Sequence, residues 1–235
     1  MKFIKHLLGL VYREYIFSNS ERSIKYWRKR GILIGKGCVV PNPKSVKMED
    51  SRTCLIKIGD NVRLNFGLTI MAHDYASVVF IRKYGELINS SGHIIIGNNI
   101  YFGRNCTVLK GVSIGDNCII GYGSVVMKDI PANSVAVGCP AKVICSIEDY
   151  FSKRKSKALN EAFEYAKAIK ERYNRKPIPK DFNEEFPYFI DKDNIADFPD
   201  VPVETQMLER YEFWLEKHKR SFNSFDDFLN AAGIK

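Results

Sequence analysis

The stretch IGNNIYFGRNCTVLKGVSIGDNCIIGYGSVV, residues 96–126, repeats an apolar residue at every sixth position. Counted by six from its start, the marked positions are Ile96, Phe102, Val108, Ile114, Ile120, Val126 and Ala132. An earlier run with the same period consists of Ile34, Val40, Val46, Arg52, Ile58, Leu64 and Ile70. A period of six is neither that of an amphipathic α-helix nor that of an ordinary β-strand alternation. It is typical of a parallel β-helix, in which each six-residue unit forms a short strand and a turn.

A β-helix accounts for both parts of the repeating unit. We expect the marked apolar side chain to point inward and to stack on its counterparts in neighbouring coils, because one unit alone cannot bury its apolar face. Glycine directly follows six of the marks, at Gly35, Gly59, Gly97, Gly103, Gly115 and Gly121. We expect it to permit a turn where φ is positive or where a side chain would clash. A β-sandwich with coincidental spacing is the alternative, which thirteen apolar residues at fourteen marks disfavour.

An insertion separates the two runs of marked positions. Ile70 and Ile96 lie 26 residues apart, which is not a multiple of six. Residues 74–95 keep no period, so we predict a loop that leaves the β-helix directly after His73. A histidine at the point where a repeat breaks is a candidate for chemistry, because imidazole changes its protonation state near neutral pH.

Both ends of the chain differ from the repeat region. The prediction is a mainly β protein with a β-helix over residues 31–147, a helical cap over residues 1–30 and a helical extension over residues 148–235. The apolar face of the first helix is predicted to carry Phe3, Ile4, Leu7, Leu8, Val11 and Tyr15. A helix on a membrane surface is the alternative to the cap. The extension is predicted to contain helices over residues 152–173 and 204–220, and a last short helix that begins near Ser224.

The net charge of the chain predicts an anionic partner. The 235 residues carry a net charge of +9, and residues 1–30 hold eight Lys or Arg against two Glu. No recognised nucleic-acid motif accompanies this charge, so nucleic acid is not a predicted partner, and anionic cofactors or membrane surfaces explain the excess as well. The N-terminal apolar stretch is too short and too charged to span a membrane. Six cysteines without CxxC spacing predict free thiols and a cytoplasmic location, which includes the inner face of the membrane.

Three stretches of the chain resemble one family. They are IGDNVRLNFGLTIMAH (residues 58–73), RKYGE (residues 82–86) and IGNNIYFGRNCTVLKGVSIGDNCIIGYGSVVMKDIPANSVAVGCPAKVI (residues 96–144). They resemble the hexapeptide-repeat acyltransferases, and most closely the galactoside, maltose and polysaccharide O-acetyltransferases. The resemblance implies a left-handed β-helix, a homotrimer, and acetyl-CoA bound between subunits without a metal ion.

The resemblance also implies the site residues. His73 is expected to act as a general base that takes the proton from an acceptor hydroxyl and then gives it to the departing CoA thiolate. Glu86 of RKYGE is the preferred partner for orienting His73, and a backbone carbonyl is the alternative. The predicted residues for binding acetyl-CoA are Gly103, Arg104, Gly121, Tyr122, Lys128, Pro140 and Lys142. The predicted acceptor-binding residues are Asn65, Asp74 and Arg82. Relatives usually have a small residue where Tyr122 stands, so either the groove differs in width or the ring stacks on the cofactor.

Several functions are compatible with these residues. The preferred one is acetyl-CoA-dependent O-acetylation of a sugar hydroxyl in cell-surface polysaccharide biosynthesis. An N-acetyltransferase of an amino sugar or of a small xenobiotic is one alternative, and a non-catalytic β-helix that serves as an assembly scaffold is another. A carbonic anhydrase with this fold needs three histidines per zinc, whereas the repeat region supplies only His73 and His93. The hypothesis of a carbonic anhydrase is therefore rejected.

Overall fold

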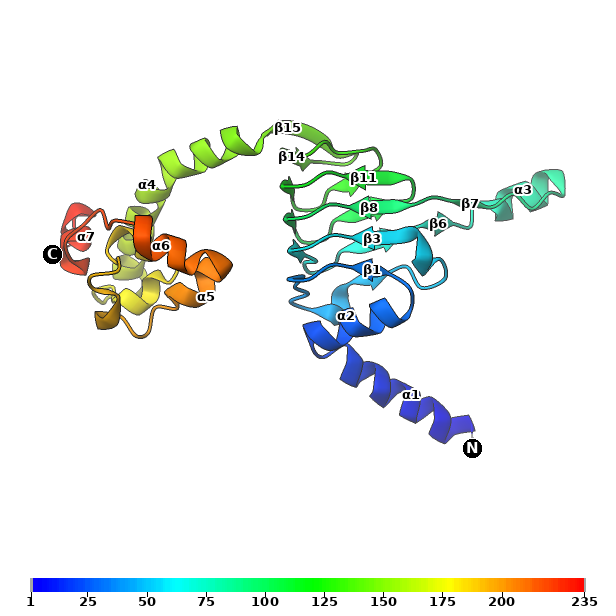
Figure 1. Cartoon of the computed structure of the whole chain (residues 1–235), viewed down its shortest axis with the longest axis horizontal. Helices are drawn as coiled ribbons and strands as arrows, with labels where there is room; N and C mark the ends of the chain where they lie inside the picture. Colours follow the sequence, from blue (N-terminus) through cyan, green and yellow to red (C-terminus); the bar gives the residue numbers. More distant parts are fainter. Residues whose placement is uncertain (1, 235) are drawn as a thin grey trace. The chain divides into compact units, whose positions relative to one another are not determined.

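The chain folds into two compact units, Met1–Phe151 and Ser152–Lys235. The computed structural model describes the backbone of residues 2–234 and the side chains of residues 8–234, so the predicted positions of Phe3, Ile4 and Leu7 lie outside the described side chains (Figure 1). Helices take up 41% of the chain and strands 19%. The prediction of a mainly β protein is therefore wrong, because the β-helix is confined to the first unit and the helices of the termini outweigh its short strands.

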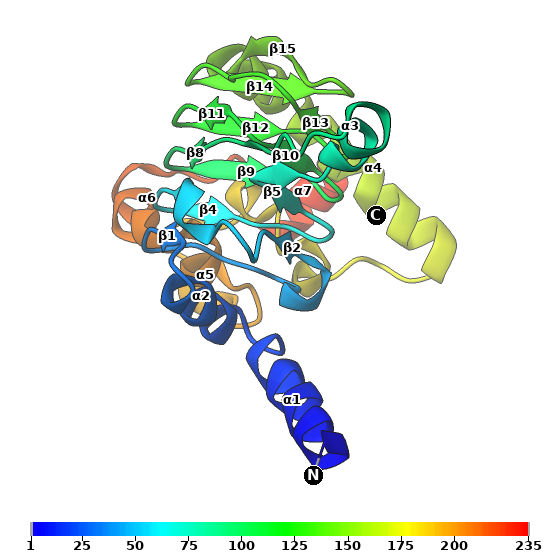
Figure 2. The same ribbon diagram turned by 90° about the vertical axis from the view of Figure 1, so that its right-hand side faces the viewer.

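Three parallel sheets form the first unit. The first sheet contains β1 (Leu33–Ile34), β3 (Ile56–Ile58), β8 (Ile94–Ile96) and β11 (Val112–Ile114). The second contains β2 (Lys47–Met48), β5 (Thr69–Met71), β10 (Thr107–Leu109) and β13 (Val125–Val126). The third contains β4 (Val62–Arg63), β9 (Ile100–Phe102), β12 (Cys118–Ile120) and β14 (Ser134–Val137), extended by the antiparallel β15 (Lys142–Ser146). The chain visits the sheets in turn, as Figure 2 shows, and this arrangement fits a left-handed β-helix.

The register of the strands gives the length of each coil. Ile96 pairs with Ile114, one coil of eighteen residues later, as the repeat predicts. Ile34 pairs with Ile58 across a coil of 24 residues, and Ile58 pairs with Ile96 across 38 residues. Most of the extra residues belong to two interruptions, residues 49–55 and residues 74–93, and two of them precede β2, where Met48 pairs with Ile70 across 22 residues. In the last coil Ile114 pairs with Ile130 after only sixteen residues, so Ile130 is buried and the marked position Ala132 is exposed.

In three turns of the coils, an asparagine adopts positive φ, and the glycine that follows the marked position does not. Asn61, Asn99 and Asn117 have φ of 56–57°, and they belong to the tetrapeptides IGDN, IGNN and IGDN. Asparagine tolerates this left-handed region better than other residues with a side chain. The glycines that follow the marks have no positive φ. A Cβ at Gly59 would lie 2.6 Å from the carbonyl oxygen of Gly97 in the next coil, so glycine is required here for close approach of the coils.

The N-terminal residues form α1 (Lys2–Ile16) and α2 (Ser20–Lys29). The side chain of Asn19 accepts a hydrogen bond from the amide of Arg22 and begins α2. Ile24 and Trp27 of α2 are buried together with the aliphatic core of the coils. Within the described side chains of α1, the large apolar residues Leu8, Leu10, Val11, Tyr12 and Tyr15 are exposed. The end of the core is thus covered by α2. No helix within residues 2–234 is long and apolar enough to cross a membrane.

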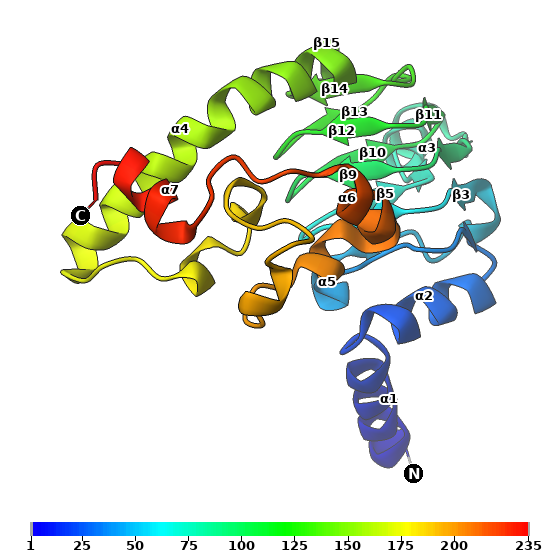
Figure 3. The ribbon, with the colours of Figure 1, turned by 60° about the vertical axis from the view of Figure 1, so that its left-hand side comes forward.

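The second unit is built around aromatic side chains. It contains most of α4 (Ile147–Tyr173), followed by α5 (Val203–Met207), α6 (Tyr211–Lys217) and α7 (Phe225–Ala231), with short 3₁₀ turns between them (Figure 3). Phe182, Phe189 and Phe228 are fully buried at its centre. The predicted single helix over residues 204–220 is wrong, because Leu208 has φ of 52° and divides it. The predicted start of the last helix is confirmed, since the hydroxyl of Ser224 accepts a hydrogen bond from the amide of Asp227 at 3.0 Å.

Candidate active site

His73 stands where the chain leaves the coils. It follows β5 and the buried Ala72, and it begins β6 (His73–Asp74). This strand pairs antiparallel with β7 (Ser90–Ser91), and the hairpin carries α3 (Ser77–Tyr84) away from the coils of the β-helix (Figure 1). The His73 side chain is 31% exposed. A histidine in this position is therefore fixed by the coil below it while its ring can meet a ligand.

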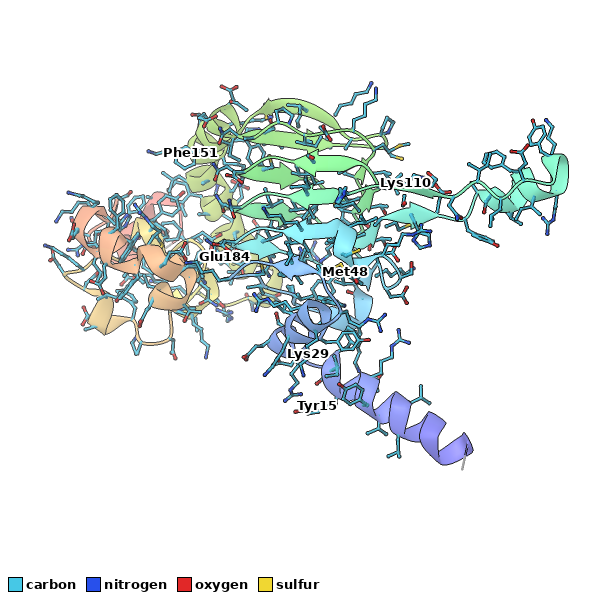
Figure 4. The ribbon with its side chains drawn as sticks, turned by 45° about the vertical axis from the view of Figure 1, so that its right-hand side comes forward. Tyr15, Lys29, Met48, Lys110, Phe151 and Glu184 are labelled. Atoms are coloured by element: carbon cyan, nitrogen blue, oxygen red, sulfur yellow. The ribbon has the colours of Figure 1, made fainter. Side chains whose placement is uncertain are left out.

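The ring of His73 contacts a buried carboxylate. The Nδ1 atom lies 2.6 Å from Oε2 of Glu49, whose side chain is 4% exposed. Glu49 directly follows β2, whose last residue, Met48, is labelled in Figure 4, and it belongs to the first interruption. The amide of Glu49 donates to the carbonyl of Ile70 at 3.0 Å, so the backbone of Glu49 is held beside β5. Two segments far apart in the sequence thus supply one pair of side chains.

The Glu49 carboxylate is saturated with donors. Its Oε1 accepts hydrogen bonds from the amides of Asp50 and Ser51 at 3.0 and 2.9 Å and from the Ser51 hydroxyl at 2.8 Å. Its Oε2 also accepts the amide of Ala72 at 3.2 Å. Burial alone would raise the pKa of Glu49, but the Ser51 amide, the His73 ring and the Ser51 hydroxyl outweigh it and lower the pKa to about 2. The carboxylate is therefore ionised throughout the neutral range.

An ionised Glu49 fixes the tautomer of His73. Because a carboxylate only accepts hydrogen bonds, we assign the proton of neutral His73 to Nδ1, which donates to Glu49. The Nε2 atom then carries a lone pair and can take a proton from a ligand. When it does so, the positive charge on the ring is stabilised by the adjacent carboxylate. The geometry of the pair is thus suited to proton transfer at Nε2.

Within one copy of the chain, the contact on His73 comes from Glu49 and not from the predicted Glu86. Glu86 is exposed after the C-terminal residue of α3, whereas Nδ1 of His73 is already bound to Glu49. Glu49 escapes a count in coils of eighteen, because Met48, the residue before it, pairs with Ile70 across 22 residues. The repeated dipeptide Ile-Gly at residues 34–35 and 58–59 gives a different spacing, 24 residues, for the first sheet. No single coil length read from the sequence therefore identifies Glu49.

The three predicted acceptor-binding residues lie in different places. Asp74 is next to His73, forms an ion pair with Lys110 and accepts the amide of Ala76 at 2.9 Å. Figure 4 shows Lys110 near the base of the hairpin. Asn65 is buried before β5, and Arg82 is exposed on α3. Only Asp74 is thus adjacent in sequence to the histidine.

Four of the predicted acetyl-CoA residues lie at one corner of the coils. Gly103 stacks below the Gly121–Tyr122 backbone, and a Cβ there would lie 2.5 Å from the amide nitrogen of Tyr122. The guanidinium of Arg104 lies 4.7 Å from the centre of the Phe66 ring. Tyr122 is 72% exposed. We call Gly103, Arg104, Gly121 and Tyr122 the glycine corner. Lys128, Pro140 and Lys142 are exposed beyond it, near β13.

The glycine corner and His73 lie at opposite edges of the second sheet. Arg104 and Tyr122 precede the strands β10 and β13, whereas His73 follows the parallel strand β5. One copy of the chain therefore does not bring these two sets of residues together. Within residues 2–234, no group of three or more His, Cys, Asp or Glu residues is arranged to hold a metal ion.

Comparisons with known proteins give relatives for the coil region. The family profile described as bacterial transferase hexapeptide (six repeats) matches residues 93–128. Galactoside O-acetyltransferase of Escherichia coli (strain K12) is 44% identical over 94 residues, which are 40% of this chain and 45% of that enzyme. Protein CapG of Staphylococcus aureus is 40% identical over 151 residues, which are 64% of this chain and 83% of CapG. The chain therefore spans less than half of the galactoside enzyme but most of CapG.

Two solved acetyltransferase structures are similar to part of this chain. A maltose O-acetyltransferase from Clostridium difficile 630 is 28% identical, with a TM-score of 0.39, and the match covers 54% of this chain and 75% of that one. A hexapeptide-repeat acetyltransferase from Vibrio cholerae is 26% identical, with a TM-score of 0.44, and the match covers 50% of this chain and 63% of that one.

Proposed function

Because the chain belongs to the bacterial hexapeptide-repeat transferases, we propose that it transfers an acetyl group from acetyl-CoA to a hydroxyl of a sugar acceptor. The observation that carries this proposal is the contact of 2.6 Å between Nδ1 of His73 and the buried carboxylate of Glu49. A scaffold does not need an oriented base, whereas acyl transfer to an alcohol does. The sugar acceptor is supported by the similarity to a galactoside O-acetyltransferase.

In the proposed reaction, Nε2 of His73 accepts the proton of the acceptor hydroxyl as its oxygen attacks the thioester carbonyl. The ion pair between the protonated ring and Glu49 stabilises the charge that develops on His73. When the carbon–sulfur bond breaks, the proton passes from Nε2 to the thiolate. The products are the acetyl ester of the acceptor and CoA with a free thiol. No covalent bond to the enzyme forms.

We place the acetyl-CoA arm along the glycine corner, with Lys128 and Lys142 beside its phosphates. Extended pantetheine needs backbone partners, and the glycines let the backbone of residues 103–104 stack closely on that of residues 121–122, because a Cβ at Gly103 would lie 2.5 Å from the amide nitrogen of Tyr122. Since His73 lies at the opposite edge of the sheet, the corner that serves it belongs to a second copy of the chain. A homotrimer, in which each subunit supplies a histidine to one neighbour and a corner to the other, satisfies this requirement.

The cellular role that we propose is acetylation of a cell-surface polysaccharide or of its precursor. This role includes a peripheral contact with the membrane through residues 1–30, where cations outnumber acids eight to two. An acceptor held at a membrane surface would reach His73 without diffusing through bulk solution.

A mass-shift screen of sugar acceptors with acetyl-CoA tests the proposed reaction. We expect one class of sugar to gain an acetyl group, and we expect His73→Asn to lower kcat by about a hundredfold or more, because general-base catalysis typically contributes ~10²–10⁴ in rate. The matched control is His93→Asn, which changes the other histidine of the coil region and should keep most of the activity. A folded His73→Asn protein that turns over at the wild-type rate would refute the proposal.

A further inference from the structure

A cavity of about 600 Å³ lies between the N-terminal helices and the first coil. We call it the N-terminal cavity. Its apolar part is formed largely by the aromatic residues Tyr12, Phe17, Tyr26 and Trp27. Its floor includes the segment from Val46 to Asp50. Since Glu49 is part of this segment, the cavity adjoins the carboxylate that holds His73.

Four cationic residues line the N-terminal cavity, at Arg13, Arg30, Lys44 and Lys47. Lys44 forms an ion pair with Glu14, and Arg30 donates to the backbone carbonyl of Asp50 at 2.7 Å. Among the described side chains, no carboxylate forms an ion pair with Arg13 or Lys47. With Glu14 counted, three carboxylates, Glu14, Glu49 and Asp50, accompany these four cations, so one positive charge is left over. The cavity therefore carries unpaired positive charge beside aromatic rings.

The outer face of α1 continues this surface with apolar side chains. Leu8, Val11, Tyr12 and Tyr15 recur at the spacing of one helical face, and each is 56–62% exposed. We call these four residues the apolar stripe. Tyr15, labelled in Figure 4, also lies under the guanidinium of Arg22, at 4.1 Å. Tyr12 belongs both to the stripe and to the cavity lining. Apolar and cationic groups thus adjoin along one helix.

This combination matches the surface of an anionic bilayer. An amphipathic helix with cations beside its apolar face lies in the interface, with apolar side chains among the acyl chains and cations at the headgroups. Aromatic residues such as tyrosine and tryptophan favour the same depth. A soluble anion would explain the cations but would leave the stripe in water. A neutral apolar partner would cover the stripe but would not use Arg13 and Lys47.

We propose that the N-terminal cavity binds the phosphate of an anionic membrane lipid while the apolar stripe lies in the bilayer surface. This proposal specifies the membrane contact of the proposed function and rests on that function for its purpose. Docking here would hold the Glu49–His73 pair close to the headgroups, where a membrane-held acceptor presents its sugar.

Vesicle sedimentation of the full chain tests the docking site. We expect at least about tenfold tighter binding to vesicles of phosphatidylcholine with phosphatidylglycerol than to phosphatidylcholine alone, and a weaker preference at higher salt. The double variant Arg13→Gln with Lys47→Gln should lose about tenfold or more in affinity, because each basic residue near an anionic surface contributes roughly fivefold. Replacement of Leu8 and Val11 by serine should weaken binding to both kinds of vesicle.

The matched control is Lys155→Gln with Lys157→Gln, which removes the same charge from two exposed positions of α4. Equal loss of binding in this control would overturn the docking site and indicate attraction by net charge alone. Binding of soluble glycerol phosphate as tightly as the vesicles would also overturn it. His73→Asn should bind vesicles like the wild type, and the Arg13/Lys47 double variant should still acetylate a soluble sugar. A protein that acetylates such a sugar but does not bind anionic vesicles would refute the docking site without contradicting the proposed reaction.

Discussion

The regular coils and the two interruptions of the first unit differ in what they contain. In residues 96–126 every inward position repeats in the next coil, and the core consists of stacked aliphatic side chains. Residues 49–55 and 74–93 have no counterpart in other coils. Glu49 is the first residue of the first interruption, and His73 directly precedes the second. A repeat places similar groups at similar positions, so it cannot by itself bring a carboxylate to an imidazole. The coils supply rigid backbone, and the departures from them supply the Glu49–His73 pair.

The largest effect should follow from a change in an interruption. We expect Glu49→Gln to lower kcat by about a hundredfold, which corresponds to about 2.7 kcal/mol in the activation free energy. Glutamine keeps the size of the side chain and one acceptor oxygen, but it lacks the charge that stabilises the protonated His73. The measurement is a steady-state acetyl-transfer assay together with a melting curve, which shows whether the variant remains folded.

Glu86→Gln is the matched control for this experiment. It makes the same chemical change in an exposed residue of the hairpin that the sequence had favoured as the partner of His73. We expect wild-type kcat from this variant. If Glu86→Gln loses activity and Glu49→Gln does not, Glu86 is the functional partner of His73 and the contact with Glu49 serves stability alone.

The same contrast explains what could be predicted from the sequence. The period of six identifies the coils because each unit has the same inward residue, and the phase change after Ile70 locates the hairpin. Glu49 was missed because a partner of His73 was sought inside the hairpin, whereas the structure supplies it from the coil below. The break at Leu208 had no signal, since neither glycine nor proline is found at residues 203–217. Long-range pairing and local strain are set by tertiary packing, which a periodic pattern does not encode.

A smaller effect, on stability, should follow from a change in the regular coils. We expect Gly59→Ala to lower the free energy of unfolding by about 2 kcal/mol, because the new methyl group would lie 2.6 Å from the carbonyl oxygen of Gly97 and the coils would have to separate. Gly9→Ala is the control, since no atom lies within 4 Å of a Cβ there, and alanine favours the helix. Denaturant titration measures both. Equal stability of the two variants would mean that the coils are loosely packed.

The smallest effect should come from the turns, where the coils use asparagine. Asn117 has φ of 57°, and its side chain accepts from Asn99 at 2.9 Å and donates to Asn133 at 3.0 Å. We expect Asn117→Ala to lower the free energy of unfolding by about 1 kcal/mol, because alanine is strained in the left-handed region. Asn117→Gly removes the same exposed hydrogen bonds but adopts positive φ freely, so it should cost less than half as much. Denaturant titration of the two variants separates the contributions. If glycine costs as much as alanine, the column of side-chain hydrogen bonds stabilises the turns, and backbone conformation contributes little.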